Sequence, residues 1–147
     1  MCHCLFTDEN VKQGARALHD ISDLPDNALK LDRIIAEFHQ QSDRFNIQIM
    51  RFFLNIAARH ARGGATEKEL RLPIGILRTT AIRYRQFLGE GGPDGEPGLG
   101  LICVEPDPRE PRRYIFRLTG KGLEFANTLL RHLDAEEAVE TLNRRSA

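Results

Sequence analysis

The residues from Thr66 to Leu88 constrain the fold most, because they have the pattern of two short helices joined by a sharp turn. Thr66 and Glu69 match a capping box, in which the threonine hydroxyl accepts a hydrogen bond from the third backbone N–H and the glutamate accepts one from the threonine N–H. Gly75 suits the sharp turn that follows. The segment from Ile76 to Leu88 then predicts a second helix, so the stretch has the pattern of a helix-turn-helix.

The second helix of this pair is basic, and it contains Arg78, Arg83 and Arg85 but no acidic residue. The chain of 147 residues has 21 basic and 21 acidic side chains in all. The segment from Arg44 to Leu88, however, has nine basic and two acidic residues, and the segments on both sides are acidic. A basic helix presented by a short capped helix is typical of proteins that contact bases in the DNA major groove, although it can also be only a solvated face.

Apolar residues recur at helical spacing on both sides of this stretch. Before it, helices are predicted over Thr7–Ile21 and Asn27–Asp43, and a third follows a cap at Asn46. After it, a last helix begins at a cap on Thr119 and carries an apolar stripe as far as Leu142. One small domain cannot cover a stripe of this length, so we expect the terminal helices to pair in a homodimer.

Two short β-prone segments, Leu101–Val104 and Tyr114–Leu118, flank a stretch rich in proline and arginine and predict a β-hairpin with a long basic tip. A hairpin in this place is the wing of a winged helix-turn-helix. The predicted fold class is therefore mainly α with a small β-hairpin wing and with N- and C-terminal dimerisation helices. We divide the one folded domain into residues 1–45 for dimerisation, 46–119 for DNA binding and 120–147 for the C-terminal dimerisation helix.

Four short motifs follow one another in an order and spacing that resemble the MarR family of bacterial transcriptional regulators, winged-helix proteins that bind DNA as dimers. The motifs are Asn46-Ile47-Gln48, LRLPIGILRTT from Leu70 to Thr80, Glu110-Pro111-Arg112 at the wing tip, and Leu118-Thr119-Gly120-Lys121-Gly122 before the last helix.

The resemblance implies that the second helix of the helix-turn-helix holds the recognition residues and that Arg112 reaches the minor groove. It also implies a dimer formed by the flanking helices and a small anionic or phenolic ligand between the dimer and DNA-binding regions. Together with the charge pattern, it leads to one set of predicted DNA-binding residues. They are Arg78, Thr79, Thr80, Arg83, Arg85, Arg109, Arg112 and Arg113.

Three features depart from the family pattern. Pro73 is expected to end the first helix of the pair early. The glycine- and proline-rich segment Gly89–Gly100 is longer than the family's direct step into the wing, and it predicts a mobile surface loop. Glu110 stands where aspartate is commoner.

Catalytic and metal-binding patterns are weak in this sequence. The histidines are scattered without a nucleophile at a recognisable spacing. Three cysteines, Cys2, Cys4 and Cys103, are too few for a disulfide framework, and the first two are too close for the usual zinc spacing. We predict no enzyme, no cofactor and no metal, and we keep redox sensing through Cys103 as a hypothesis.

The function predicted from these residues is a homodimeric, sequence-specific regulator that binds double-stranded DNA and responds to a ligand or to redox state. The alternative is a winged-helix module that binds an acidic protein partner and no DNA. No run of residues approaches the ~18 apolar positions of a membrane span, and the N-terminus lacks the pattern of a secretory signal. We therefore expect a cytoplasmic protein with no membrane partner.

Overall fold

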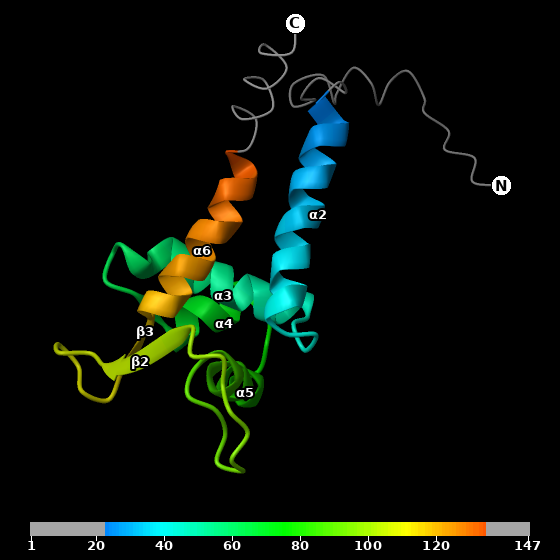
Figure 1. The fold of residues 1–147 in the computed structure, drawn as a ribbon. Coiled ribbons are helices and arrows are strands. Elements are labelled where there is room, and N and C mark those ends of the chain that lie inside the picture. The colour runs from blue at the N-terminus through cyan, green and yellow to red at the C-terminus, as the bar shows by residue number, and fades with distance from the viewer. Residues whose placement is uncertain (1–22, 135–147) are drawn as a thin grey trace, which may run out of the picture.

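The structure, a computed structural model, describes residues 23–134 as a winged helix-turn-helix unit from which two long helices rise side by side (Figure 1). It confirms the predicted fold class, mainly α with a small β-hairpin wing. The predicted helix over Thr7–Ile21 and the end of the last helix lie outside the described residues. The elements are α2 (Leu24–Gln41), α3 (Ile47–His60), β1 (Ala65–Thr66), α4 (Glu67–Ile74), α5 (Arg78–Leu88), β2 (Ile102–Pro106), β3 (Tyr114–Leu118) and α6 (Gly120–Leu133).

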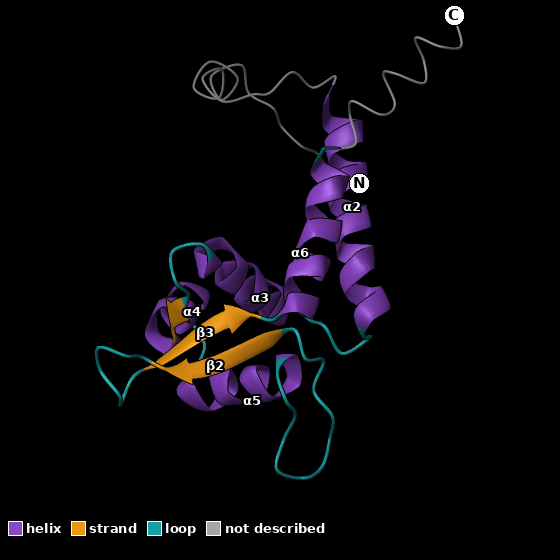
Figure 2. Cartoon of the chain, turned by 60° about the vertical axis from the view of Figure 1, so that its left-hand side comes forward, coloured by secondary structure: helices purple, strands orange, loops and turns teal. Residues whose placement is uncertain are grey.

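The three strands form one antiparallel sheet in the order β1-β3-β2 (Figure 2). The β2–β3 hairpin confirms the predicted wing, with β3 over the expected residues and β2 displaced toward the wing tip. Cys103 lies opposite Arg117 in this hairpin, and Ala65 of β1 lies opposite Phe116. The prediction lacked β1 because a two-residue strand is too short to show an alternating pattern.

Aromatic rings join the two long helices to the winged unit. Phe38 of α2 is 1% exposed, and its ring centroid lies 5.2 Å from that of Phe125 in α6 and 5.9 Å from that of Phe53 in α3. Farther down, Phe52 of α3 packs edge-on against Phe116 of β3 at 5.9 Å. A single core therefore runs from the base of the helix pair into the sheet.

Above that core, α2 and α6 continue together (Figures 1 and 2). His132 Nε2 of α6 lies 2.9 Å from Glu37 Oε1 of α2. The helix α2 begins at Leu24 and not at Asn27 as predicted, because Pro25 fits the first turn of a helix, where its missing N–H has no partner to lose. No helix among residues 23–134 has both the length and the apolar character needed to cross a lipid bilayer.

The three side-chain caps that were predicted within the described residues are all present. Asn46 Oδ1 accepts a hydrogen bond from the N–H of Ile49 at 2.9 Å, and Thr119 Oγ1 accepts one from Gly122 at 3.1 Å. The capping box at α4 has both of its bonds, with Thr66 N–H donating to Glu69 Oε2 at 2.8 Å. These caps fix where α3, α4 and α6 begin, as the sequence indicates.

The capping box should make the stability of the fold depend on acid. The hydrogen bond from the Thr66 backbone N–H lowers the pKa of Glu69 below its ordinary value. A carboxylate with a lowered folded pKa stabilises the fold above its unfolded pKa, about 4.3, and this stabilisation is lost as the pH falls through the folded pKa. Glutamine keeps an oxygen acceptor but does not titrate. We therefore expect Glu69→Gln to melt below wild type at pH 7 and the gap to narrow as the pH falls below about 4.3 and through the lowered folded pKa.

The measurement is the thermal unfolding midpoint of both proteins across that pH range. Asn46→Ala, which removes the cap of α3 and leaves the Glu69 carboxylate untouched, serves as the pH-independent control and should cost about 1 kcal/mol. A gap between wild type and Glu69→Gln that stays constant with pH contradicts the assignment.

Candidate nucleic-acid interface

The turn between α4 and α5 fixes the direction of the candidate recognition helix. Gly75 has a φ of 74°, a left-handed conformation that favours glycine, and its N–H donates to the carbonyl of Arg71 at 3.0 Å. The prediction that Pro73 ends α4 early is wrong, because α4 continues to Ile74. Pro73 lies inside the last turn, where its missing N–H costs α4 a single backbone hydrogen bond, and its carbonyl accepts a hydrogen bond from Arg51 Nη2 at 3.2 Å.

One face of α5 is buried and the other is exposed. Ala81, Tyr84 and Leu88 face the core, and the Tyr84 hydroxyl donates to Gln48 Oε1 at 2.8 Å. The buried positions recur every three or four residues, so the remaining positions share the outer face. The predicted residues on that face are Arg78, Thr79, Arg83 and Arg85, all exposed, while Thr80 is half-buried.

Two contacts hold arginines of this outer face in place. Arg78 Nε lies 3.7 Å from Glu67 Oε2 of α4, and the Arg78 side chain is 79% exposed. Arg85 lies over the ring of Tyr114 on β3, 5.8 Å from its centroid. The first contact positions the arginine at the start of α5 against α4, and the second connects α5 to the wing.

The wing tip is organised by Asp107, a residue that the sequence analysis did not select. Asp107 is 8% exposed, its Oδ1 accepts the N–H of Arg109 at 2.9 Å, and its own N–H donates to the carbonyl of Arg113 at 2.7 Å. Arg113 Nη2 pairs with Glu110 Oε2 at 2.8 Å. An aspartate that precedes a proline at the end of a strand is a recognisable signal for such a turn.

A cleft of about 1140 Å³ lies between α4, α5 and the wing. Four of the predicted residues line it, namely Arg78, Arg85, Arg112 and Arg113; Thr79, Thr80, Arg83 and Arg109 do not. The sequence analysis missed four basic residues in the cleft because they come from α3, α4 and the turn between them. They are Arg59, Arg62, Lys68 and Arg71.

The cleft is strongly positive, because its eight basic side chains face three acidic ones, Glu67, Glu69 and Glu110. Glu67 lies 3.4 Å from Arg71 and 3.7 Å from Arg78, so it separates two cations that would otherwise repel. Arginine forks in an open groove suit a polyanion, which can contact several of them at once. Within residues 23–134 we find no cluster of three or more potential metal-ligating side chains.

Cys103 lies outside this cleft. It is half-buried on β2 and lines a second, smaller pocket of about 540 Å³ with Ile82 and Arg85 of α5. The other two cysteines, Cys2 and Cys4, are outside the described residues.

Comparisons with known proteins identify the fold. No protein-family model matches the sequence, and no curated protein matches it either. Among solved structures, the MepR–DNA complex from S. aureus is 19% identical, with a TM-score of 0.55 over 80% of this chain and 84% of that chain. RV1404 from Mycobacterium tuberculosis is 18% identical, with a TM-score of 0.50 over 86% and 82%. A structure of MarR is 25% identical, with a TM-score of 0.49 over 87% and 83%. The chain has a MarR-like winged-helix fold.

Proposed function

We propose that this protein is a homodimeric transcriptional regulator that binds double-stranded DNA in a sequence-specific manner and acts by binding, not by catalysis. One observation carries the proposal: the exposed basic face of α5 and the wing tip border the same positive cleft. In this arrangement α5 enters the major groove, and Arg112 of the wing lies over the adjacent minor groove.

The chemistry of the exposed side chains suits the two kinds of DNA contact. An arginine fork can bond the O6 and N7 atoms of guanine together, whereas threonine contacts a phosphate or a thymine methyl group. The cleft residues Arg59, Arg62 and Lys68 add cations beside the groove-facing helix. MepR, which has the same fold, was crystallised with DNA, and this supports a DNA duplex as the polyanion.

The experiment is a fluorescence-anisotropy titration of the full chain with duplexes from the DNA around its own gene, at several salt concentrations. We expect binding whose affinity falls steeply with salt, and at least one fragment bound far more tightly than a random duplex. Absence of binding at low salt contradicts the proposal. A stoichiometric protein partner that DNA does not displace would favour the alternative, a module for protein–protein interaction.

The homodimer rests on apolar side chains that the described chain leaves uncovered. Exposed leucines and isoleucines recur along both long helices, and helices with such stripes commonly bury them against a second copy. These residues are Leu24, Leu29, Leu31 and Ile35 on α2 and Leu123, Leu130 and Leu133 on α6.

Charged substitutions on these stripes should therefore produce a monomer. We expect Leu31→Lys with Leu130→Lys to halve the mass measured by light scattering and to weaken DNA binding, because two linked half-sites bind more tightly than one. Lysine at the exposed positions Gln40 and Glu124, which face away from Leu31 on α2 and from Leu130 on α6, is the control and should leave the mass unchanged. A wild-type protein that is monomeric at micromolar concentration contradicts the dimer.

We also propose that DNA binding responds to oxidation of Cys103. A small-molecule effector is a further part of the proposal, but we assign no residues to its site. Oxidation of the Cys103 thiol would enlarge a half-buried side chain next to Ile82 and Arg85 of α5. We expect peroxide to weaken DNA binding several-fold and Cys103→Ser to remove the effect. An unchanged response in Cys103→Ser, measured by the same titration, excludes this thiol as the sensor.

A further inference from the structure

The segment Gly89–Gly100 is a folded hairpin loop at the end of α5. Its two arms are joined by hydrogen bonds from Gly92 N–H to the carbonyl of Glu96 at 3.1 Å and from Gly100 N–H to the carbonyl of Gly89 at 2.9 Å. A Cβ on Gly98 would collide with the backbone of the opposite arm at Gly89, so the close approach requires glycine. The predicted surface location is correct, and the loop has a defined shape.

The loop is acidic, whereas the helix that it follows is basic. It contains Glu90, Asp94 and Glu96, all exposed, and no basic residue. Ile82 and Arg85 of α5 line both the positive cleft and the smaller pocket, whose other wall includes Glu90. The acidic loop and the positive cleft are therefore separated by one turn of α5.

The loop also extends beyond α5. Both views show it projecting past this helix on the side away from the α2–α6 pair, and Figure 2 shows α5 between the wing tip at one end and the loop at the other. A duplex that lies on the outer face of α5 and reaches the wing would meet the loop at the C-terminal end of the helix.

We infer that the Gly89–Gly100 loop is a phosphate-repelling boundary of the DNA site. Its three carboxylates limit how far the duplex extends past the C-terminal end of α5, and they lower the affinity for every duplex alike. Like charges repel over a screening length of about 8 Å at physiological salt, so these carboxylates act on phosphates that are bound against the C-terminal end of α5. Because non-specific binding is almost wholly electrostatic, such a boundary also limits the retention of the protein on bulk DNA. The inference rests on the proposed DNA binding.

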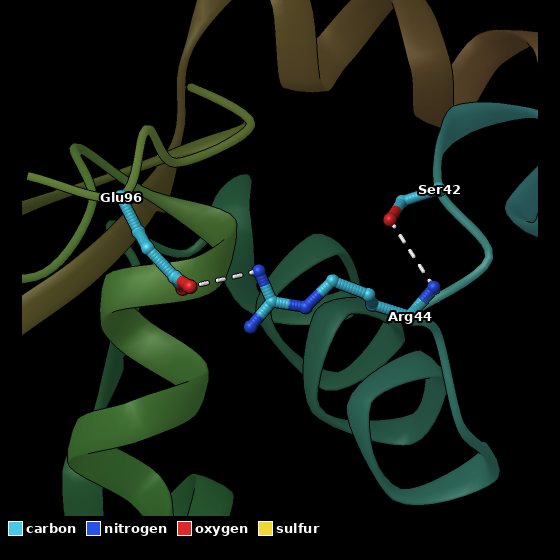
Figure 3. Close-up of polar contacts among 3 residues, drawn as sticks. All are labelled: Ser42, Arg44 and Glu96. Carbon is cyan, nitrogen blue, oxygen red and sulfur yellow. Dashed lines mark hydrogen bonds and ion pairs between the residues drawn. The ribbon is translucent and has the colours of Figure 1, made fainter.

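One ion pair ties the loop to the junction between α2 and α3 (Figure 3). Arg44 Nη1 lies 3.2 Å from Glu96 Oε2, and the Arg44 guanidinium also stacks over the ring of Phe87 in α5, 5.1 Å from its centroid. The Arg44 N–H donates to Ser42 Oγ at 3.2 Å, which helps to fix the junction. Arg44 and Glu96 are 59% and 69% exposed, so the pair positions the loop more than it stabilises the fold.

The test removes the three charges and leaves the backbone of the loop unchanged. We expect Glu90→Gln/Asp94→Asn/Glu96→Gln to bind a random duplex about three to ten times more tightly than wild type at low salt, with the gain falling below about twofold at high salt. The matched control is Asp23→Asn/Asp26→Asn/Asp32→Asn, which removes equal charge from exposed positions before and in the first half of α2, the half that is far from α5 (Figure 1). It should bind as wild type does.

The two halves of the ion pair provide a readout that a purely structural role would not produce. Glu96→Gln should strengthen DNA binding, because it removes a repelling charge. Arg44→Gln should weaken it, because it leaves Glu96 uncompensated. If the pair served only to hold the loop, both variants would change the affinity in the same direction.

Each outcome decides the inference. A triple loop variant that binds no more tightly than wild type overturns the boundary while the proposed DNA binding stands, and so does an equal gain in the α2 control. A wild-type protein that binds no duplex overturns both. Circular dichroism checks the fold of each variant, and should the triple variant unfold, Asp94→Asn alone at the exposed turn carries the test, with a smaller gain expected.

Discussion

Replacement of both Arg78 and Arg83 with alanine is expected to reduce the affinity for a specific duplex by about 30-fold or more. Each arginine that bonds a guanine bidentately contributes ~1–3 kcal/mol of discrimination, and about 1.4 kcal/mol corresponds to a tenfold change in affinity. Both side chains lie on the exposed face of α5, away from the buried residues Ala81 and Tyr84. Their removal should therefore leave the fold intact while it removes base contacts.

The measurement is the anisotropy titration, with the preferred fragment and a random duplex compared in parallel. The pair Arg33→Ala and Arg131→Ala is the matched control, because it removes equal charge from exposed positions on α2 and α6. We expect the α5 variant to lose the preference between the two duplexes, and the control to keep it. A similar loss in both variants would mean that only the overall charge matters and would contradict a recognition role for α5.

Glu67 gives this experiment a further internal check. Because Arg78 contacts Glu67 at 3.7 Å, DNA binding has to replace an exposed ion pair, which costs no more than about 1 kcal/mol. Glu67→Gln should thus remove the ion pair with Arg78 and also remove a negative charge from the cleft. Its effect on DNA binding should be small compared with the loss of the arginines themselves.

The second large effect is expected on stability, from Phe38→Ala. Phe38 is 1% exposed and its ring contacts three others, those of Phe45, Phe53 and Phe125. Truncation of a buried phenylalanine usually costs about 3–5 kcal/mol, because apolar burial is lost and a cavity remains. A loss of this size is a large part of the stability of a domain of this length.

Chemical denaturation monitored by circular dichroism measures the loss. Gln40→Ala, at an exposed position on the same helix, should stay within about 0.5 kcal/mol of wild type. Phe38→Leu should recover part of the stability, since it fills much of the cavity but lacks the ring contacts. Because Phe38 joins α2 to both α3 and α6, a small effect of Phe38→Ala would mean that the helix pair does not depend on this junction.

Much of the fold could be predicted because its signals are local. A helix cap is a hydrogen bond between residues three apart in the sequence. The caps at Asn46, Thr66 and Thr119 therefore predicted the starts of α3, α4 and α6 correctly. The β3 strand was equally clear from its β-prone residues. The errors occurred where two local rules compete, as at Pro25 and Pro73, which break a helix in its middle but are tolerated near its ends.

The candidate site was predictable only in part, because it combines residues that are distant along the chain. The arginines of α5 and the wing followed from charge pattern and from family resemblance, and four of them line the cleft. Arg59 and Arg62, at the end of α3 and just beyond it, had no such signal. Their place in the cleft depends on the pairing of β1 with β3 of the wing, which holds the end of α3 beside the wing.

The sequence by itself determined the order of the elements, three of the helix starts, the wing and the basic character of α5, because propensity, capping and charge act between near neighbours. Only the tertiary structure decided which basic side chains share a cleft, that Asp107 is buried at the wing tip, and that the acidic Gly89–Gly100 loop folds into a hairpin paired with Arg44. These features depend on contacts between distant segments, such as that of Arg44 with Glu96, which are settled by packing around the common aromatic core.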